Sequence, residues 1–98
     1  MRQVRVDDYV FETLMPDLVL HDHKPSAFLV YLHLWHRTAG RSNARVRTSH
    51  QQMANAIGLS KSAVQGAIRT LTRRKLLRAS RHGTTATPEY TVLRPWRR

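Results

Sequence analysis

Hydrogen-bonding side chains recur at helical spacing between positions 60 and 73. On a helix, residues three or four apart lie on the same side. Four of them define what we call the reading face: Ser62, Gln65, Arg69 and Arg73. A glutamine can pair with adenine, and an arginine with guanine, through two hydrogen bonds each. The spacing therefore favours recognition of base edges, with Ser60 and Lys61 as further contacts. Gly66 lies between them and is either a point of close approach to a base pair or a tolerated glycine.

Two further groups of residues fit contacts to phosphate. The first surrounds the start of an expected helix, where free backbone amides favour an anion; it comprises Arg45, Arg47, Thr48, Ser49 and Gln51. The second lies on an expected basic hairpin, which suits a groove or the backbone of a duplex; it comprises Arg78, Arg81, His82, Thr84 and Thr85. An expected arm extends this basic surface with Arg94, Arg97 and Arg98.

The histidines and carboxylates do not indicate a metal site or a catalytic site. His33 and His36 share a helix face, and residues 21–23 read "HDH". The sequence has no cysteine, and no acidic residue has zinc-site spacing to the helical pair. Spacing alone identifies no catalytic set among the few carboxylates. We therefore expect a non-enzyme with no metal, no cofactor and no small-molecule ligand.

Charge divides the chain into two unequal parts. The 98 residues carry a net charge of +11, yet the first 22 sum to −3 and the remainder to +14. Such a density of positive charge repels itself unless a polyanion neutralises it. Nucleic acid is the usual polyanion, a membrane surface is the rival, and a merely solvated surface is the third alternative. No apolar run is long enough to span a bilayer, and the first residues do not resemble a signal peptide. We expect a cytoplasmic, nucleoid-associated protein that does not bind membranes.

One glycine inside a helical pattern indicates two helices joined by a tight turn. Residues 51–71 keep helical apolar spacing on both sides of Gly58. Glycine enters the left-handed conformation that ends a helix without steric cost. Ser49 and Ser60 are placed to cap the helices before and after it. The second helix carries an apolar stripe opposite the reading face: Val64, Ala67, Ile68 and Leu71. This pattern is typical of a helix-turn-helix.

The flanking segments complete the predicted fold. Pro25 begins a helix that ends near Gly40, and this helix is apolar over most of its circumference. One side should face the core; the other, together with Trp96, is the candidate dimer surface, with packing inside one chain as the alternative. Residues 45–47 alternate as a strand, and residues 76–81 and 88–94 as a β-hairpin. Residues 3–6 also alternate like a strand, and residues 15–21 fit a helical turn starting at Pro16.

The segment "TSHQQMANAIGLSKSAVQGAIRTLTRRKLLRASR" resembles the winged helix-turn-helix regulators of bacteria and phages, of the GntR and MarR kind. The matching positions are Ser49, Met53, Ala54, Gly58, Leu59, Ser60, Val64, Ala67, Ile68 and Leu71. Lys75 stands where that pattern has a glycine before the first strand of the wing. Residues 11–34 are similar to the lead-in of DNA-binding domains in phage and plasmid replication proteins. The resemblance implies double-stranded DNA binding, commonly by a homodimer on an inverted repeat.

These observations predict a mainly α chain with a small β-hairpin, a winged helix-turn-helix with a three-helix core plus a wing. We expect an N-terminal extension over residues 1–23 and the DNA-binding domain over residues 24–98. The expected function is a small transcriptional repressor that binds double-stranded DNA as a homodimer. Plasmid or phage replication or partition is an alternative on the same surface. A protein- or RNA-binding adaptor is the alternative of another class, and Arg69, Arg73 and Arg74 argue against it.

Overall fold

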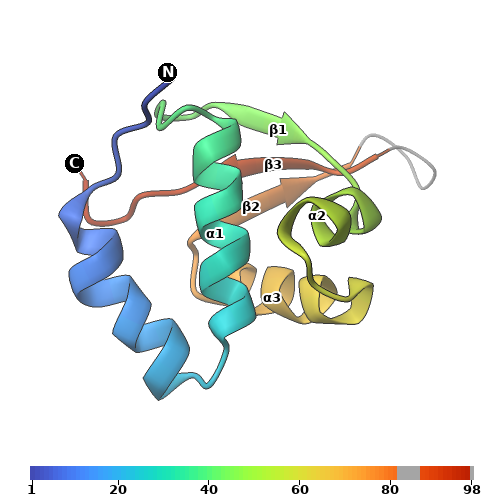
Figure 1. Cartoon of the computed structure of the whole chain (residues 1–98), viewed down its shortest axis with the longest axis horizontal. Coiled ribbons are helices and arrows are strands. Elements are labelled where there is room, and N and C mark those ends of the chain that lie inside the picture. The colour runs from blue at the N-terminus through green and yellow to red at the C-terminus, as the bar shows by residue number, and fades with distance from the viewer. Residues whose placement is uncertain (82–86, 98) are drawn as a thin grey trace.

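A computed structural model describes residues 1–81 and 87–97, so His82, Thr84, Thr85 and Arg98 of the expected DNA contacts lie outside the described residues. Two short π-helical segments come first and are followed by a helix, a strand, two helices and two strands. They are η1 (Val10–Leu14), η2 (Asp17–His21), α1 (Pro25–Arg37), β1 (Arg45–Arg47), α2 (His50–Ile57), α3 (Lys61–Arg73), β2 (Leu77–Ser80) and β3 (Glu89–Val92). Figure 1 shows α1 in the middle, with the N-terminal segment on one side and the sheet, α2 and α3 on the other.

The predicted helix-turn-helix is confirmed in its details. Gly58 ends α2 with a φ of +91°, and its N–H donates to the Ala54 carbonyl at 2.9 Å. Ser49 caps α2 by accepting from the Gln52 N–H at 3.0 Å. Ser60 caps α3 by accepting from the Ala63 N–H at 3.1 Å. Each helix end is therefore set by a local side chain or backbone angle, which is why the sequence predicts it.

The three strands form an antiparallel sheet in the order β1-β3-β2. Tyr90 of β3 lies opposite Val46 on one side and Ala79 on the other, and Val92 lies opposite Leu77. Val46, Leu77, Tyr90 and Val92 are buried, so this face of the sheet packs into the core. Side chains alternate along a strand. Arg45, Arg47 and Arg78 therefore lie on the outer face of the sheet.

The first 23 residues share the core of the rest of the chain. Val10, Leu14 and Leu18 belong to the same buried cluster as α1, α3 and the sheet. The wider π-helical turn returns a side chain to the same side about every four to five residues, which aligns these three positions. The predicted turn at 15–21 thus belongs to a helical stretch that begins at Asp8. The division into residues 1–23 and 24–98 stays a prediction.

The predicted strand at residues 3–6 is wrong. These residues have no regular secondary structure. The Arg5 carbonyl accepts instead from Trp35 Nε1 at 2.7 Å, so this backbone group is bound by a side chain rather than by a neighbouring strand. The alternation of Val4 and Val6 reflects packing of both side chains against the core.

The candidate dimer surface is packed inside one chain, as the alternative interpretation held. Trp96 stacks on Tyr9 with ring centroids 4.6 Å apart and lies 6.4 Å from the Trp35 ring. Its Nε1 donates to the Asp7 carboxylate at 2.8 Å. Val30 and Leu34 of α1 are fully buried. Val30 and Leu34 are therefore not available to a second copy, and Trp96 is partly buried by contacts within the chain.

Acidic residues of the first segment pair with basic residues of the same chain. Arg74, directly after α3, donates to both oxygens of Asp22 at 2.6 and 2.9 Å. Arg97 pairs with Asp7 in the same two-bond manner. Hydrogen bonds from Arg74, and then from His21, lower the pKa of Asp22 from 3.8 to about 2. Arg74 is thus neutralised internally, which removes it from the free cations beside the reading face.

Candidate nucleic-acid interface

The reading face is on the exposed side of α3. Ser62, Arg69 and Arg73 are exposed and Gln65 is half-buried. The predicted apolar stripe lies opposite and is buried: Val64, Ala67, Ile68 and Leu71. α3 contains no acidic residue. The helix therefore presents hydrogen-bond donors and positive charge outward from a surface that is fixed to the core.

Gly66 lies on the same side of α3 as the reading face, but long side chains cover it. It is buried, and a Cβ at this position would lie 3.4 Å from Lys24 Nζ. Both interpretations of Gly66, close approach to a base pair and a tolerated glycine, stay predictions, because the atoms that cover it are the ends of two long side chains of exposed residues, Lys24 and Arg69. The same contact places the Lys24 ammonium beside α3. Sequence reasoning missed this cation, since no spacing pattern connects position 24 to position 66.

Three basic side chains from separate elements meet at one end of the molecule. His50 begins α2, Lys61 begins α3, and Arg81 follows β2. Burial lowers the pKa of His50, and the charges of Lys61 and Arg81 lower it further. In Figure 1, the side of the molecule away from both termini holds α2 and the start of α3. The end of β2 and the beginning of β3 lie on the same side. Lys61 and Arg81, predicted from different motifs, thus both lie near enough to His50 for their charges to affect its pKa.

The phosphate-binding group around Ser49 is only partly exposed. Ser49 and Gln52 form a reciprocal capping box, in which the Ser49 N–H donates to Gln52 Oε1 at 2.9 Å. Gln51 is exposed and donates to Asn55 Oδ1 at 3.0 Å. Thr48 is 1% exposed, and its hydroxyl donates to Gln52 Oε1 at 3.4 Å. The prediction that Thr48 contacts phosphate is therefore wrong, because its hydroxyl is bound within the cap and does not reach the surface.

The arginines of the strands form a separate surface from the reading face. Arg45 and Arg47 lie 3.5 and 3.7 Å from the two oxygens of Glu89, and all three project from the outer face of the sheet. Arg78 is on the same outer face, across β3 from Arg45. α3 packs on the inner side, so these arginines and the reading face point in different directions. One carboxylate partly offsets the charge of two exposed arginines here.

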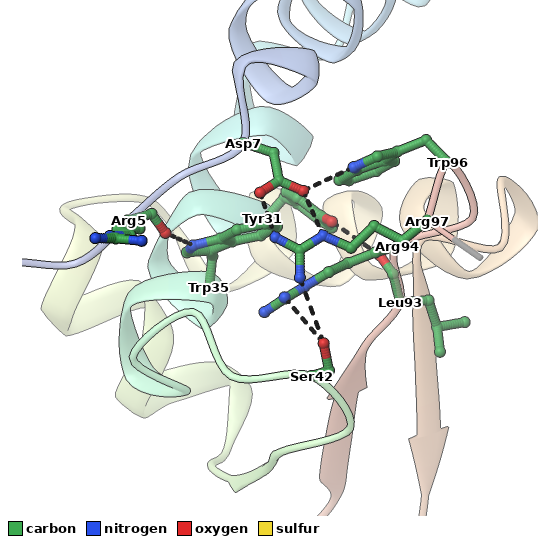
Figure 2. A network of polar contacts seen from close by, with 9 residues as sticks. All are labelled: Arg5, Asp7, Tyr31, Trp35, Ser42, Leu93, Arg94, Trp96 and Arg97. Carbon is green, nitrogen blue, oxygen red and sulfur yellow. Dashed lines mark hydrogen bonds and ion pairs between the residues drawn. The ribbon is translucent and has the colours of Figure 1, made fainter.

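The prediction that the last arginines form an extended arm is wrong for Arg94 and Arg97, the two that the structure describes. Arg97 is bound to Asp7, as described above. Arg94 lies with its guanidinium carbon 4.1 Å from the centre of the Trp35 ring. Both side chains are directed back onto the molecule, as Figure 2 shows.

No three side chains of His, Cys, Asp or Glu gather as a metal site in the described part of the chain. None of the helices described is long and apolar enough to cross a membrane.

Comparison with known proteins identifies the fold. No protein-family model and no curated protein matches the chain. The chain is similar in structure to the crystal structure of the AntR antimony-specific transcriptional repressor. The two share 22% sequence identity, the match covers 97% of this chain and 75% of that chain, and the TM-score is 0.53. At this identity the likeness concerns the fold alone. Together with the element order and the sheet register, it shows that the chain has a winged-helix fold, as the sequence predicted.

Proposed function

We propose that this chain is a sequence-specific double-stranded DNA-binding protein that represses transcription by occupying a promoter. The observation that carries the proposal is the composition of the exposed side of α3: Ser62, Gln65, Arg69 and Arg73 project from a helix that has no carboxylate. A winged-helix fold by itself does not specify a ligand. These side chains add the donors and acceptors that recognition of base edges requires.

The neighbouring cations give the proposed orientation on a duplex. With α3 in the major groove, Lys61 and Arg81 lie at the same end of the molecule as the start of α2. The N-terminus of α2 would face a phosphate there, because helix N-termini attract anions. The Lys24 ammonium lies beside Gly66, on the same side of α3 as the reading face. Phosphate contacts by these cations would fix the register of the reading face without contributing sequence preference.

We further propose that the protein acts as a homodimer on an inverted repeat. Large apolar side chains of residues 9–20 and of the start of α1 remain between 39% and 71% exposed: Tyr9, Phe11, Met15, Val19, Leu20 and Leu29. Apolar side chains gathered in this way favour contact with another protein surface. A two-fold dimer would read half-sites about one helical turn apart. Sedimentation of the free chain and of its complex with selected DNA measures the stoichiometry.

Selection of bound sequences from random duplexes tests the function directly. The selected sites are expected to contain an inverted repeat. Arg69→Ala should then relax the base preference at one position of each half-site, by about 5- to 150-fold, the ratio that corresponds to about 1–3 kcal/mol for a lost bidentate base contact. Arg81→Ala should weaken binding to all sequences alike and reduce the salt slope by about one per subunit.

Arg37→Ala is the matched control, because Arg37 is an exposed arginine at the end of α1 and belongs to none of the proposed contacts. It should leave the base preference unchanged. If Arg69→Ala behaves like Arg37→Ala, α3 does not read bases. If the chain shows no salt-dependent retention on duplex DNA, the adaptor alternative replaces the repressor.

A further inference from the structure

A cavity of about 270 Å³ lies beside the C-terminal end of β3. It is lined by Ser42, Asn43, Val92, Leu93, Arg94 and Arg97. Its polar lining comes from the turn before β1 and from the segment after β3, which Figure 2 shows side by side. None of these residues belongs to the proposed reading face. The cavity therefore requires an explanation of its own.

Arg94 is the unusual member of the lining. Its Nη1 donates to Ser42 Oγ at 3.2 Å. Its Nε and Nη2 are buried and have no hydrogen-bond partner among the described residues. A buried donor without a partner destabilises the fold, and more so when the donor is charged. Burial also lowers the pKa of Arg94.

Comparison with two other arginines of the chain shows what is missing at Arg94. The Nε and Nη2 atoms lie on the same edge of the guanidinium group, and this edge matches the two oxygens of a carboxylate or phosphate. In Arg74 this edge binds Asp22, and in Arg97 it binds Asp7. In Arg94 the equivalent edge binds no carboxylate among the described residues.

The charge around the cavity also favours an anion. Arg94 and Arg97 both line it, and both donate to the hydroxyl of Ser42, at 3.2 and 3.4 Å. The nearby carboxylate is Asp7, whose oxygens already accept from Trp96 and Arg97. Two guanidinium groups thus share one carboxylate, which leaves a net positive charge at the cavity.

We propose that this cavity binds a small oxyanion, a molecule bearing a carboxylate or phosphate group, through the unpaired edge of Arg94. Because Nε and Nη2 are closed off from solvent and the guanidinium stacks on the Trp35 ring, anion binding requires the Arg94 side chain to turn away from that ring towards the cavity it lines. The anion accepts two parallel hydrogen bonds from Arg94, and Ser42 and the Nη1 of Arg97 lie beside it. The site is independent of the reading face, and the inference does not rest on DNA binding.

Titration of the full chain with inorganic phosphate and with acetate tests the proposal, at constant ionic strength maintained with chloride. Calorimetry measures the affinity, and the rise in melting temperature gives a second measurement, because a ligand of the native state stabilises it by mass action. Saturable binding of either anion, with one site per chain, is expected. Phosphate binding without acetate binding assigns a phosphate ligand, and binding of both assigns the carboxylate and phosphate class as a whole.

Arg94→Gln should lower the affinity for the anion at least tenfold. Arg94→Lys should lower it as much although it keeps the charge, because lysine lacks the paired donor edge of a guanidinium group. Both variants also lose the guanidinium that stacks on the Trp35 ring, so the rise in melting temperature is measured from each variant's own value without anion. Arg37→Gln, which removes a cation outside the cavity, should bind the anion as the parent does. The proposal is overturned by three results: no saturable binding of either anion, equal weakening by Arg37→Gln, or binding that Arg94→Lys retains. Loss of duplex DNA binding in Arg94→Gln without any anion binding would also overturn it, because Arg94 would then be a DNA contact.

Discussion

The pairing of Asp22 with Arg74 predicts that the acidic segment anchors the end of α3. Arg74 Nε and Nη2 donate to the carboxylate at 2.6 and 2.9 Å, and the side chains of Arg74 and Asp22 are 29% and 13% exposed. The bond joins positions that are 52 residues apart in the sequence. Asp22→Asn removes the negative charge while nearly preserving the size of the side chain. It therefore measures the contribution of the charged carboxylate, which both Arg74 and His21 contact.

The expected loss follows from the pKa of Asp22. Folding lowers this pKa from 3.8 to about 2. One pKa unit corresponds to about 1.36 kcal/mol, so the contacts of the Asp22 carboxylate, mainly with Arg74 and also with His21, contribute about 2 kcal/mol to the free energy of unfolding at pH 7. Because the folded pKa is below the unfolded one, this contribution is complete above about pH 5. It falls to about half at pH 3 and is largely lost as the pH reaches 2.

Urea unfolding followed by circular dichroism at pH 7, 5 and 3 measures the effect. Asp22→Asn should lower the free energy of unfolding by about 2 kcal/mol at pH 7 and by about half of that at pH 3. Asp8→Asn is the matched control, since Asp8 is exposed and forms no ion pair with the described residues. Combining Asp22→Asn with Arg74→Gln should cost less than the sum of the two single changes. Equal losses for Asp8→Asn and Asp22→Asn, or losses independent of pH, would refute the reasoning.

Three further changes test the backbone and the caps by the same unfolding measurement. Gly58→Ala should cost about 1–2 kcal/mol, because alanine is strained at a φ of +91° while no atom lies within 4 Å of the added Cβ; an unchanged stability would contradict the role of this glycine. Ser60→Ala should cost about 1 kcal/mol through loss of the bond to the Ala63 N–H, and Ser62→Ala, which removes no cap, should cost less. Lys75→Gly should stabilise the chain by about 0.5 kcal/mol, because Lys75 has a φ of +59°; a lower melting temperature would show that its side chain matters more than its backbone.

The parts of the fold that the sequence predicts are those determined by neighbouring residues. Ser49, Gly58 and Ser60 each set a helix end through a contact no more than four residues away. Lys75 illustrates the same point: its φ is positive although it is not glycine, so the turn before β2 keeps the shape that a glycine would give it. Local chemistry of this kind can be recognised in a sequence one segment at a time.

The parts that the sequence did not predict depend on contacts between distant segments. The contact of Lys24 with Gly66 and the bond from Arg74 to Asp22 both require α1 and the N-terminal segment to be placed against α3. Spacing identifies which face of α3 is apolar but not which neighbour covers its edge. The burial of Thr48 has the same origin, because its N–H donates to the Pro88 carbonyl of the segment before β3 at 3.2 Å. The residues of the reading face stay a prediction for DNA contact, and selection of bound sequences tests them.

The middle position of β3 has a consequence for communication through the molecule. Both edges of β3 are hydrogen-bonded, to β1 and to β2. Glu89 at its beginning faces the strand arginines, and the residues after its end border the cavity at Arg94. One strand of four residues thus separates the two surfaces. If an anion in the cavity changes the affinity of the strand arginines for a partner, the partner changes the affinity for the anion by the same factor.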